Sequence, residues 1–187
     1  RRVEVATGAV TTLAGSGEGG DADGVGDAAE FDGLAGIAVS PDGRALFVAD
    51  FGNHKIRRVE VATREVTTIA GSGTSGSADG VGDAAEFDGP FGVALSSDAS
   101  AATQLKSPSE IRRVEVATVA VTTLAGSGEG GDADGEGEAE EFCGPRGLAI
   151  SPDGGALFVG RPLRSRPQLQ RERIVCGGLR QPQDPAG

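Results

Sequence analysis

Apolar and polar positions between residues 33 and 73 alternate in a way that predicts four short strands joined by tight turns. The predicted strands are 36–40 (GIAVS), 45–49 (ALFVA), 55–62 (KIRRVEVA) and 66–71 (VTTIAG). The second is apolar throughout, as in a strand covered on both faces. The third alternates, with Val59 and Val61 on one face and charged residues on the other. The tetrapeptide Ser40-Pro41-Asp42-Gly43 suits a type I turn because proline presets φ at the second position.

The same pattern recurs along the chain. AGSG starts at 14, 70 and 125, and SPDG at 40–43 returns as SSDA at 96–99 and SPDG at 151–154. The pair Glu-Phe falls at 30–31, 86–87 and 141–142. Each series advances by 56 and then 55 residues, so three markers share one register. Four antiparallel strands repeated in tandem predict the blades of a β-propeller.

Long acidic, glycine-rich segments link the units, as in 15–33 (GSGEGGDADGVGDAAEFDG). One phenylalanine recurs in each segment, at Phe31, Phe87 and Phe142. We expect it to fill a gap between neighbouring units, although an exposed side chain is the alternative. In the first unit, Gly8 of ATGAV (6–10) can take the positive φ of a hairpin turn.

The string GIAVSPDGRALFVADFGNHKIRRVEVATREVTTIAGSG (36–73) resembles the NHL repeat, with its apolar strand, Pro-Asp-Gly turn, Val-Ala-Asp, Asn-His and Ile-Arg. The resemblance extends over about 1–160. It implies a propeller of NHL-type blades, which usually number six in that family. Such blades serve both as scaffolds and as enzymes, so the resemblance is specific for fold and weak for activity.

The units differ in completeness. We expect two strands of one blade in 1–14, a full blade in 36–71, a degraded blade in 92–126 and a half blade in 147–159. The second unit has SDASAATQLKSPSE (97–110) where the first has PDGRALFVADFGNHK (41–55). A frame slip in the coding sequence or ordinary divergence would explain this loss. The Arg-, Pro- and Gln-rich tail 161–187 is predicted to be disordered.

About three blade equivalents therefore predict an all-β fold that is a partial, open or incomplete β-propeller. Arg1 and Arg2 stand inside a repeat and no initiator Met precedes them, so we expect a segment of a longer protein. Open blade edges favour self-association, into a ring for example. No apolar run is long enough to span a membrane.

Asp50, Asn53 and His54 in ADFGNHKI form the one site-like cluster, and they include the single His of the chain. The resemblance makes this Asp-x-x-Asn-His a repeated turn element, whose side chains bond local backbone groups. A catalytic or metal role is the alternative. Propeller lactonases and amidating lyases need several converging ligands, and one His cannot supply a multi-His zinc site.

The acidic linkers raise the question of Ca²⁺ binding. The candidate ligands are Asp21, Asp23 and Asp27 in the first linker and Asp132, Asp134 and Glu138 in the third, while Ser77 replaces one carboxylate in the second. None matches a twelve-residue calcium loop. We therefore expect solvated loops and assign no metal, cofactor or catalytic residue. Cys143 and Cys176 have no metal-ligand spacing and are interpreted as incidental thiols.

The net charge of the chain and its distribution bear on the classes of ligand that it can bind. The net charge is −11, and residues 1–160 carry 11 basic against 26 acidic side chains. This acidic body disfavours nucleic-acid binding. For Arg57-Arg58 and Arg112-Arg113 we predict cross-strand pairing with residues such as Glu60 and Glu115. No nucleophile elbow, P-loop or dinucleotide fingerprint is present.

These observations favour a non-catalytic NHL-repeat scaffold that binds a protein partner. The alternative is a fragment of a lactonase- or amidating-lyase-like propeller whose catalytic residues lie outside this chain. Clustered His, Glu and Asn in flanking sequence would favour the enzyme, and adjoining receptor, kinase or RING-like segments would favour the scaffold.

Overall fold

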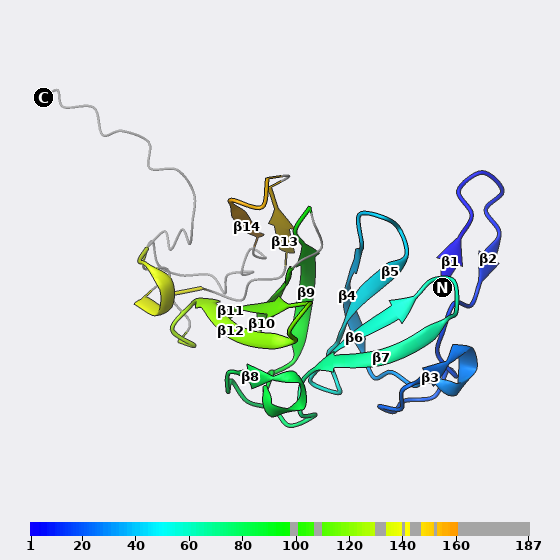
Figure 1. The fold of residues 1–187 in the computed structure, drawn as a ribbon, viewed down its shortest axis with the longest axis horizontal. Coiled ribbons are helices and arrows are strands. Elements are labelled where there is room, and N and C mark those ends of the chain that lie inside the picture. The colour runs from blue at the N-terminus through cyan, green and yellow to red at the C-terminus, as the bar shows by residue number, and fades with distance from the viewer. Residues whose placement is uncertain are drawn as a thin grey trace, which may run out of the picture.

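The computed structural model describes residues 1–97, 101–106, 110–129, 134–139, 141–142, 147–151 and 153–160, with the backbone alone for 101–106. Within them, strands form four antiparallel sheets, and the helical elements are short 3-10 turns. The sheets follow one another across the molecule in Figure 1. The all-β fold predicted from the alternation is therefore confirmed. In this described part, no helix has the length and apolarity to span a bilayer.

The first large sheet corresponds to the unit from which the strands were predicted. Its strands are β4 (Leu34–Val39), β5 (Ala45–Asp50), β6 (Lys55–Glu60) and β7 (Glu65–Ala70). They pair in sequence order, and β3 (Gly24–Val25) from the preceding linker adds a fifth strand beside β7. The predicted strand ends agree with these to within two residues.

The second large sheet repeats this order. It comprises β9 (Pro90–Leu95), β10 (Ala101–Lys106), β11 (Glu110–Glu115) and β12 (Ala120–Ala125), with β8 (Gly80–Val81) beside β12. Strand β10 lies in the segment that was expected to be degraded, yet it pairs with both β9 and β11. The ladder bonds come from the backbone, so a strand forms here without the Leu-Phe-Val run of β5.

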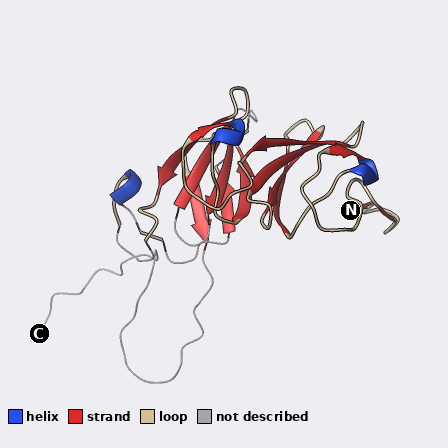
Figure 2. Ribbon diagram, turned by 90° about the horizontal axis from the view of Figure 1, so that it is seen from below, coloured by secondary structure: helices blue, strands red, loops and turns tan. Residues whose placement is uncertain are grey.

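Two smaller sheets flank the large ones. One joins β1 (Arg2–Val3) to β2 (Val10–Thr11), and the other joins β13 (Gly147–Ile150) to β14 (Leu157–Gly160). The 3-10 turns η1 (Gly26–Ala28), η2 (Gly82–Ala84) and η3 (Gly137–Ala139) lie in the linkers and are the blue elements of Figure 2. The predicted tail 161–187 lies outside the described residues.

The turn between β4 and β5 forms as its sequence predicts. The Gly43 amide donates to the Ser40 carbonyl at 2.8 Å, and Gly43 has φ of 72°. The Ser40 hydroxyl donates to Asp42 Oδ1 at 2.6 Å, and the Arg44 amide donates to the same oxygen at 3.0 Å. The Ser40 hydroxyl bond, followed by the Arg44 amide bond, lowers the pKa of Asp42 below its ordinary value of 3.8.

The hairpin turn that closes each unit requires a left-handed residue at one position. Gly8 occupies it with φ of 71°, which confirms the prediction for ATGAV, while Arg64 (63°) and Val119 (52°) occupy it in the next two units. Left-handed φ is easy for glycine and costly for a β-branched residue. The same backbone therefore forms in all three units with different local strain.

The main core lies between the two large sheets. Its buried members are Ala45, Phe47, Ala49, Ile56, Ile69, Ala70, Ala85, Phe87, Val93, Val114 and Val121. Phe87 is fully buried here, as expected for a residue that fills the gap between units. Phe31 is half-buried and packs on a second cluster around Val48, Val59 and Val66.

The innermost strands β4 and β9 approach each other closely. A Cβ atom on Gly36 would lie 2.7 Å from the Phe91 carbonyl oxygen and 2.9 Å from the Gly92 Cα. Glycine at this position therefore allows the two sheets to meet backbone to backbone.

Candidate functional site

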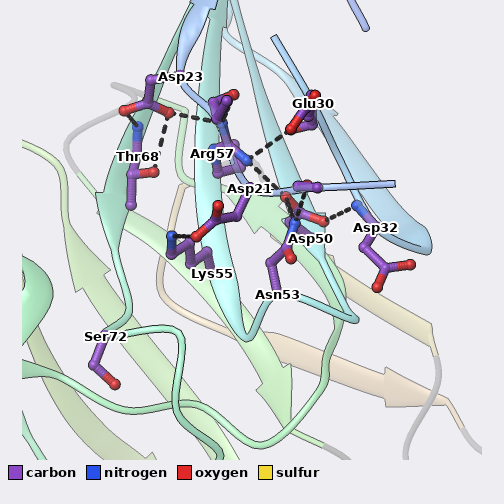
Figure 3. A network of polar contacts seen from close by, with 12 residues as sticks. Asp21, Asp23, Glu30, Asp32, Asp50, Asn53, Lys55, Arg57, Thr68 and Ser72 are labelled. Atoms are coloured by element: carbon purple, nitrogen blue, oxygen red, sulfur yellow. Dashed lines mark hydrogen bonds and ion pairs between the residues drawn. The ribbon is translucent and has the colours of Figure 1, made fainter. Parts of the chain in front are cut away.

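The predicted cluster lies at the turn between β5 and β6, within a polar network shown in Figure 3. Asp50 is the last residue of β5, and Asn53 and His54 follow in the turn. The structure brings Asp50 and Asn53 into contact and adds Arg57 from β6, which sequence reasoning did not include. His54 bonds to a different segment.

Asp50 is fully buried, and both of its carboxylate oxygens accept hydrogen bonds. Oδ1 accepts from the Asp32 amide at 2.9 Å. Oδ2 accepts from Asn53 Nδ2 at 2.9 Å and from Arg57 Nη1 at 2.8 Å. The carboxylate therefore joins the linker, the turn and β6, and a buried charge requires such partners.

Arg57 is also fully buried and holds the preceding linker against the sheet. Its Nη1 donates to the Glu30 carbonyl at 3.1 Å, and its Nη2 donates to the Ala22 carbonyl at 2.9 Å and to Asp23 Oδ1 at 2.7 Å. The guanidinium carbon lies 5.1 Å from the centroid of the Phe31 ring, in cation–π geometry. The recurring phenylalanine therefore covers a buried cation.

A signal for this burial was present in the alternation of β6. Arg57 has the same parity as Val59, whose face was predicted to be buried, whereas Arg58 has the opposite parity. Arg57 forms a cross-strand charge pair, with Asp50 on β5, whereas the predicted cross-strand pairing is wrong for Arg58 and Arg113. Arg58 pairs with Glu60 two residues along the same strand, and Arg113 pairs with Glu115 at 3.1 Å in the same way.

The first acidic linker uses two of its three candidate carboxylates on the sheet. Asp21 accepts from Lys55 Nζ at 2.7 Å, and this hydrogen bond and charge lower the pKa of Asp21 below its ordinary value of 3.8. Asp23 accepts from Arg57 and also from the Thr68 amide and hydroxyl, at 2.9 and 3.1 Å. Asp27 is exposed in η1.

Asn53 and His54 reach further than the local turn for which they were predicted. Asn53 Nδ2 donates to the Gly20 carbonyl at 2.7 Å as well as to Asp50. The Gly89 amide donates to His54 Nδ1 at 3.0 Å, and Gly89 belongs to the linker that enters the next sheet. His54 has φ of 54°, so a left-handed residue positions the ring for this contact. The turn therefore contacts both neighbouring linkers.

The second sheet contains a related network around Arg112. Nη1 donates to the Glu86 carbonyl at 3.1 Å, and Nη2 donates to the Ala78 carbonyl at 3.1 Å and to Asp79 at 2.6 Å. The Phe87 centroid lies 5.7 Å from the guanidinium carbon. Because the same set of linker groups surrounds two arginines one unit apart, the network is a property of the repeat.

The described residues show no group of three or more His, Cys, Asp or Glu side chains arranged to hold a metal. Of the third-linker candidates, Asp134 is exposed, Asp132 lies outside the described residues, and Glu138 is described only as backbone in η3. Cys143 and Cys176 also lie outside them. Chemically, the network around Asp50 binds the molecule's own linkers with its donors and acceptors.

No family model matches the chain. Over 76 residues, or 41% of the chain, it is 36% identical to Protein SUPPRESSOR OF QUENCHING 1, chloroplastic, of Arabidopsis thaliana, and this match spans 7% of that protein.

Solved structures with a similar fold include two auxiliary nutrient binding proteins. An auxiliary nutrient binding protein from Bacteroides thetaiotaomicron superposes with a TM-score of 0.56 at 24% identity, over 66% of this chain and 34% of the other. An auxiliary nutrient binding protein from Bacteroides ovatus gives 0.57 at 23% identity, over 69% and 35%. Both are propeller proteins, and the chain spans about a third of each. The chain is therefore similar in fold to part of a β-propeller.

Proposed function

We propose that this chain is a non-catalytic binding module of NHL-type propeller blades that contacts a protein partner within a longer protein or assembly. The blades occupy 1–160, with two strands of one blade in 1–14, blades in 36–71 and 92–126 and a half blade in 147–159. The alternating strands, the shared repeat register and the Asp50–His54 turn support this assignment.

The observation that carries the proposal is the use of the site-like groups inside the fold. Both oxygens of Asp50 accept bonds from the chain itself, and His54 Nδ1 accepts from the Gly89 amide. A general acid or base must instead reach a proton on a substrate. These side chains therefore support a scaffold role at this turn, and the two structural neighbours, both nutrient binding proteins, favour binding over turnover.

The same turn presents an aromatic surface for a partner. Phe51 is 42% exposed, and its ring meets that of Phe91 edge to face, with centroids 6.3 Å apart and an interplanar angle of 89°. Gly33 and Gly89 of the two linkers lie beside the Phe51 ring. Exposed aromatic residues on a rigid framework are frequent anchors of protein interfaces.

The test is to capture partners on the immobilised chain, purify the partner found and titrate it calorimetrically. Phe51→Ala should weaken binding by about tenfold or more, as at an interface hot spot. Val25→Ala removes another exposed apolar side chain and serves as the matched control. Equal binding by the Phe51 variant would overturn the assigned surface. Clustered His, Glu and Asn residues in the flanking sequence would instead favour the hydrolase or lyase alternative, whose catalytic residues lie outside this chain.

A further inference from the structure

Asp32 is held in place by its backbone while its side chain carries an unpaired charge. Its amide donates to Asp50 Oδ1 at 2.9 Å, and its carbonyl accepts from the Gly52 amide at 2.8 Å. Its exposed carboxylate has no hydrogen bond or ion pair with any described residue. In Figure 3 this carboxylate points away from the polar network. A fixed negative charge is therefore presented to solvent beside the β5–β6 turn.

The basic side chains of β6, the strand that follows this turn, already have carboxylate partners. The pairs are Lys55 with Asp21, Arg57 with Asp23 and Asp50, and Arg58 with Glu60. In the next unit, the residue equivalent to Asp32 is Asp88, whose Oδ1 accepts from the Ser75 hydroxyl at 2.8 Å. Asp32 thus differs from its counterpart, because both of its carboxylate oxygens are open to a donor from outside the described chain.

An aromatic ring lies beside this carboxylate. A Cβ atom on Gly52, the residue after Phe51, would lie 2.6 Å from Asp32 Cγ and 2.7 Å from Asp32 Oδ2. A Cβ atom on Gly33, the residue after Asp32, would lie 3.9 Å from Phe51 Cδ1. The Phe51 side chain is 42% exposed. The carboxylate and the ring are therefore neighbours on the surface, and the residue that follows each of them is a glycine with no side chain to cover the other.

The interior of the chain contains the same pair of groups twice, each time with an arginine bound. The two sets are Arg57 with Asp23 and Phe31, and Arg112 with Asp79 and Phe87. The ion pairs are 2.7 and 2.6 Å long, and the guanidinium carbons lie 5.1 and 5.7 Å from the ring centroids. A guanidinium satisfies both groups at once, because it pairs with a carboxylate and is attracted to an aromatic face. At the surface, Asp32 and Phe51 present these groups without an arginine from the described chain.

We propose that the protein partner of this surface supplies an arginine, whose guanidinium pairs with Asp32 and stacks on Phe51. This inference rests on the binding role proposed above and specifies the chemistry of the partner. Arginine fits better than lysine, because its planar fork can donate two N–H groups to one carboxylate while its face covers a ring. The net charge of −11 also favours the approach of a basic segment.

The first experiment uses short peptides as probes. One peptide has a central arginine flanked by alanine and glycine, with both ends blocked, and matched peptides carry lysine or the neutral analogue citrulline instead. Binding to the 187-residue chain is followed by NMR through the amide signals of Gly33, Gly52 and Gly89. The arginine peptide should bind about tenfold more tightly than the citrulline peptide and about threefold more tightly than the lysine peptide. Equal binding of the arginine and citrulline peptides would overturn the inference.

The second experiment repeats the arginine titration with Asp32→Asn, matched by Asp27→Asn. Asp27 is exposed in η1 of the same linker, so both variants remove one surface charge. Asp32→Asn should weaken binding about fivefold, whereas Asp27→Asn should weaken it less than about twofold. Circular dichroism melts should be unchanged for Asp32→Asn, because its carboxylate has no partner among the described residues. Equal weakening by the two variants would show that net charge alone attracts the peptide, and would overturn the inference.

Titration of the purified protein partner distinguishes this inference from the proposed function on which it rests. Asp32→Asn and Phe51→Ala should each weaken the partner, and their effects should be less than additive in the double variant, because both groups contact one arginine. Weakening by Phe51→Ala, with Asp32→Asn and Asp27→Asn binding equally, would keep the docking surface and overturn the arginine contact. Unchanged binding by Phe51→Ala would refute the docking surface itself.

Discussion

The two large sheets bury equivalent arginines with different partners. Arg57 has the carboxylates of Asp23 and Asp50, whereas Arg112 has Asp79 and, at 3.9 Å, Glu110. Across the strand pair, Asp50 is opposite Lys55 in the first sheet, and Lys106 is opposite Glu110 in the second. The signs of the two charges are therefore exchanged.

This difference separates the constant part of the unit from the variable part. The linker side, with two carbonyls, a carboxylate and a phenylalanine, is the same around both arginines. The turn side differs, since the first sheet has Asp50, Asn53 and His54 in contact with linkers. Partners from the linker thus surround both buried arginines, and the β5–β6 turn of the first sheet contributes further hydrogen bonds.

The largest expected effect on the two sheets is the loss of stability when each buried arginine is truncated to alanine. Arg57→Ala leaves Asp50 buried without its cation and should lower the free energy of unfolding by about 3–5 kcal/mol. Arg112→Ala should cost about 2 kcal/mol, because the side chain of its partner Asp79 is 52% exposed and can be hydrated. Urea unfolding monitored by circular dichroism measures both values. A larger loss for Arg112→Ala would refute the role assigned to Asp50.

The next effect concerns the contact between the sheets. Gly36→Ala places a methyl group against the β9 backbone and should destabilise the chain by about 2 kcal/mol. Gly147→Ala in β13 is the matched control, because the nearest atom to its Cβ would be the Gly160 Cα at 3.8 Å. Thermal melts should separate the two variants, and equal melting temperatures would contradict the close approach of β4 and β9.

His54 offers a smaller test of the turn. His54→Asn removes the imidazole acceptor but retains a residue that tolerates positive φ. The Gly89 amide then loses its bond, so the expected cost is about 1 kcal/mol, with faster hydrogen exchange at Gly89. Unchanged exchange at Gly89 in the variant would show that the bond contributes nothing.

The closing hairpins should respond to glycine to different extents. Val119→Gly relieves a β-branched residue at φ of 52° and should stabilise the chain by about 0.5–1 kcal/mol. Arg64→Gly gains less, because it removes the bond from Arg64 Nε to the Leu13 carbonyl at 2.8 Å. Denaturant midpoints compare the two. A larger stabilisation by Arg64→Gly than by Val119→Gly would refute the backbone strain assigned to Val119.

The smallest effect is a pH dependence at the β4–β5 turn. Since the pKa of Asp42 is lowered on folding, its contribution is present above pH 3.8 and is lost as pH falls below that value. Ser40→Ala should raise the Asp42 pKa toward 3.8, as measured by NMR titration. Asp153, whose pKa is lowered chiefly by Ser151, is the internal control and should not move.

Sequence reasoning succeeded where structure follows local rules. Strand alternation located β4 to β7, and Pro41 with Gly43 predicted the turn that forms. Gly8 likewise marked a positive φ. Each of these depends on backbone preferences within a few residues.

Prediction from the sequence failed where the environment of a residue is formed by segments that are distant in the sequence. Cross-strand charge pairing was predicted for Arg57, but its burial was not, because its partners Ala22, Asp23 and Glu30 lie in another part of the chain. The partner of His54 is a backbone amide, which carries no sequence signal. Strand β10 was missed because its side chains lack the expected apolar run while its backbone still pairs.

The short strands β3 and β8 impose an order on folding. Residues 24–25 pair with the last strand of the sheet that follows them, at 65–66, and 80–81 pair likewise with 120–121. During synthesis, β3 and β8 can therefore pair only after the whole sheet that follows each of them has left the ribosome. Closing the loop between β3 and β7, or between β8 and β12, costs chain entropy before any hydrogen bond forms. The pairing of the last strand with the linker is therefore the step that completes each unit.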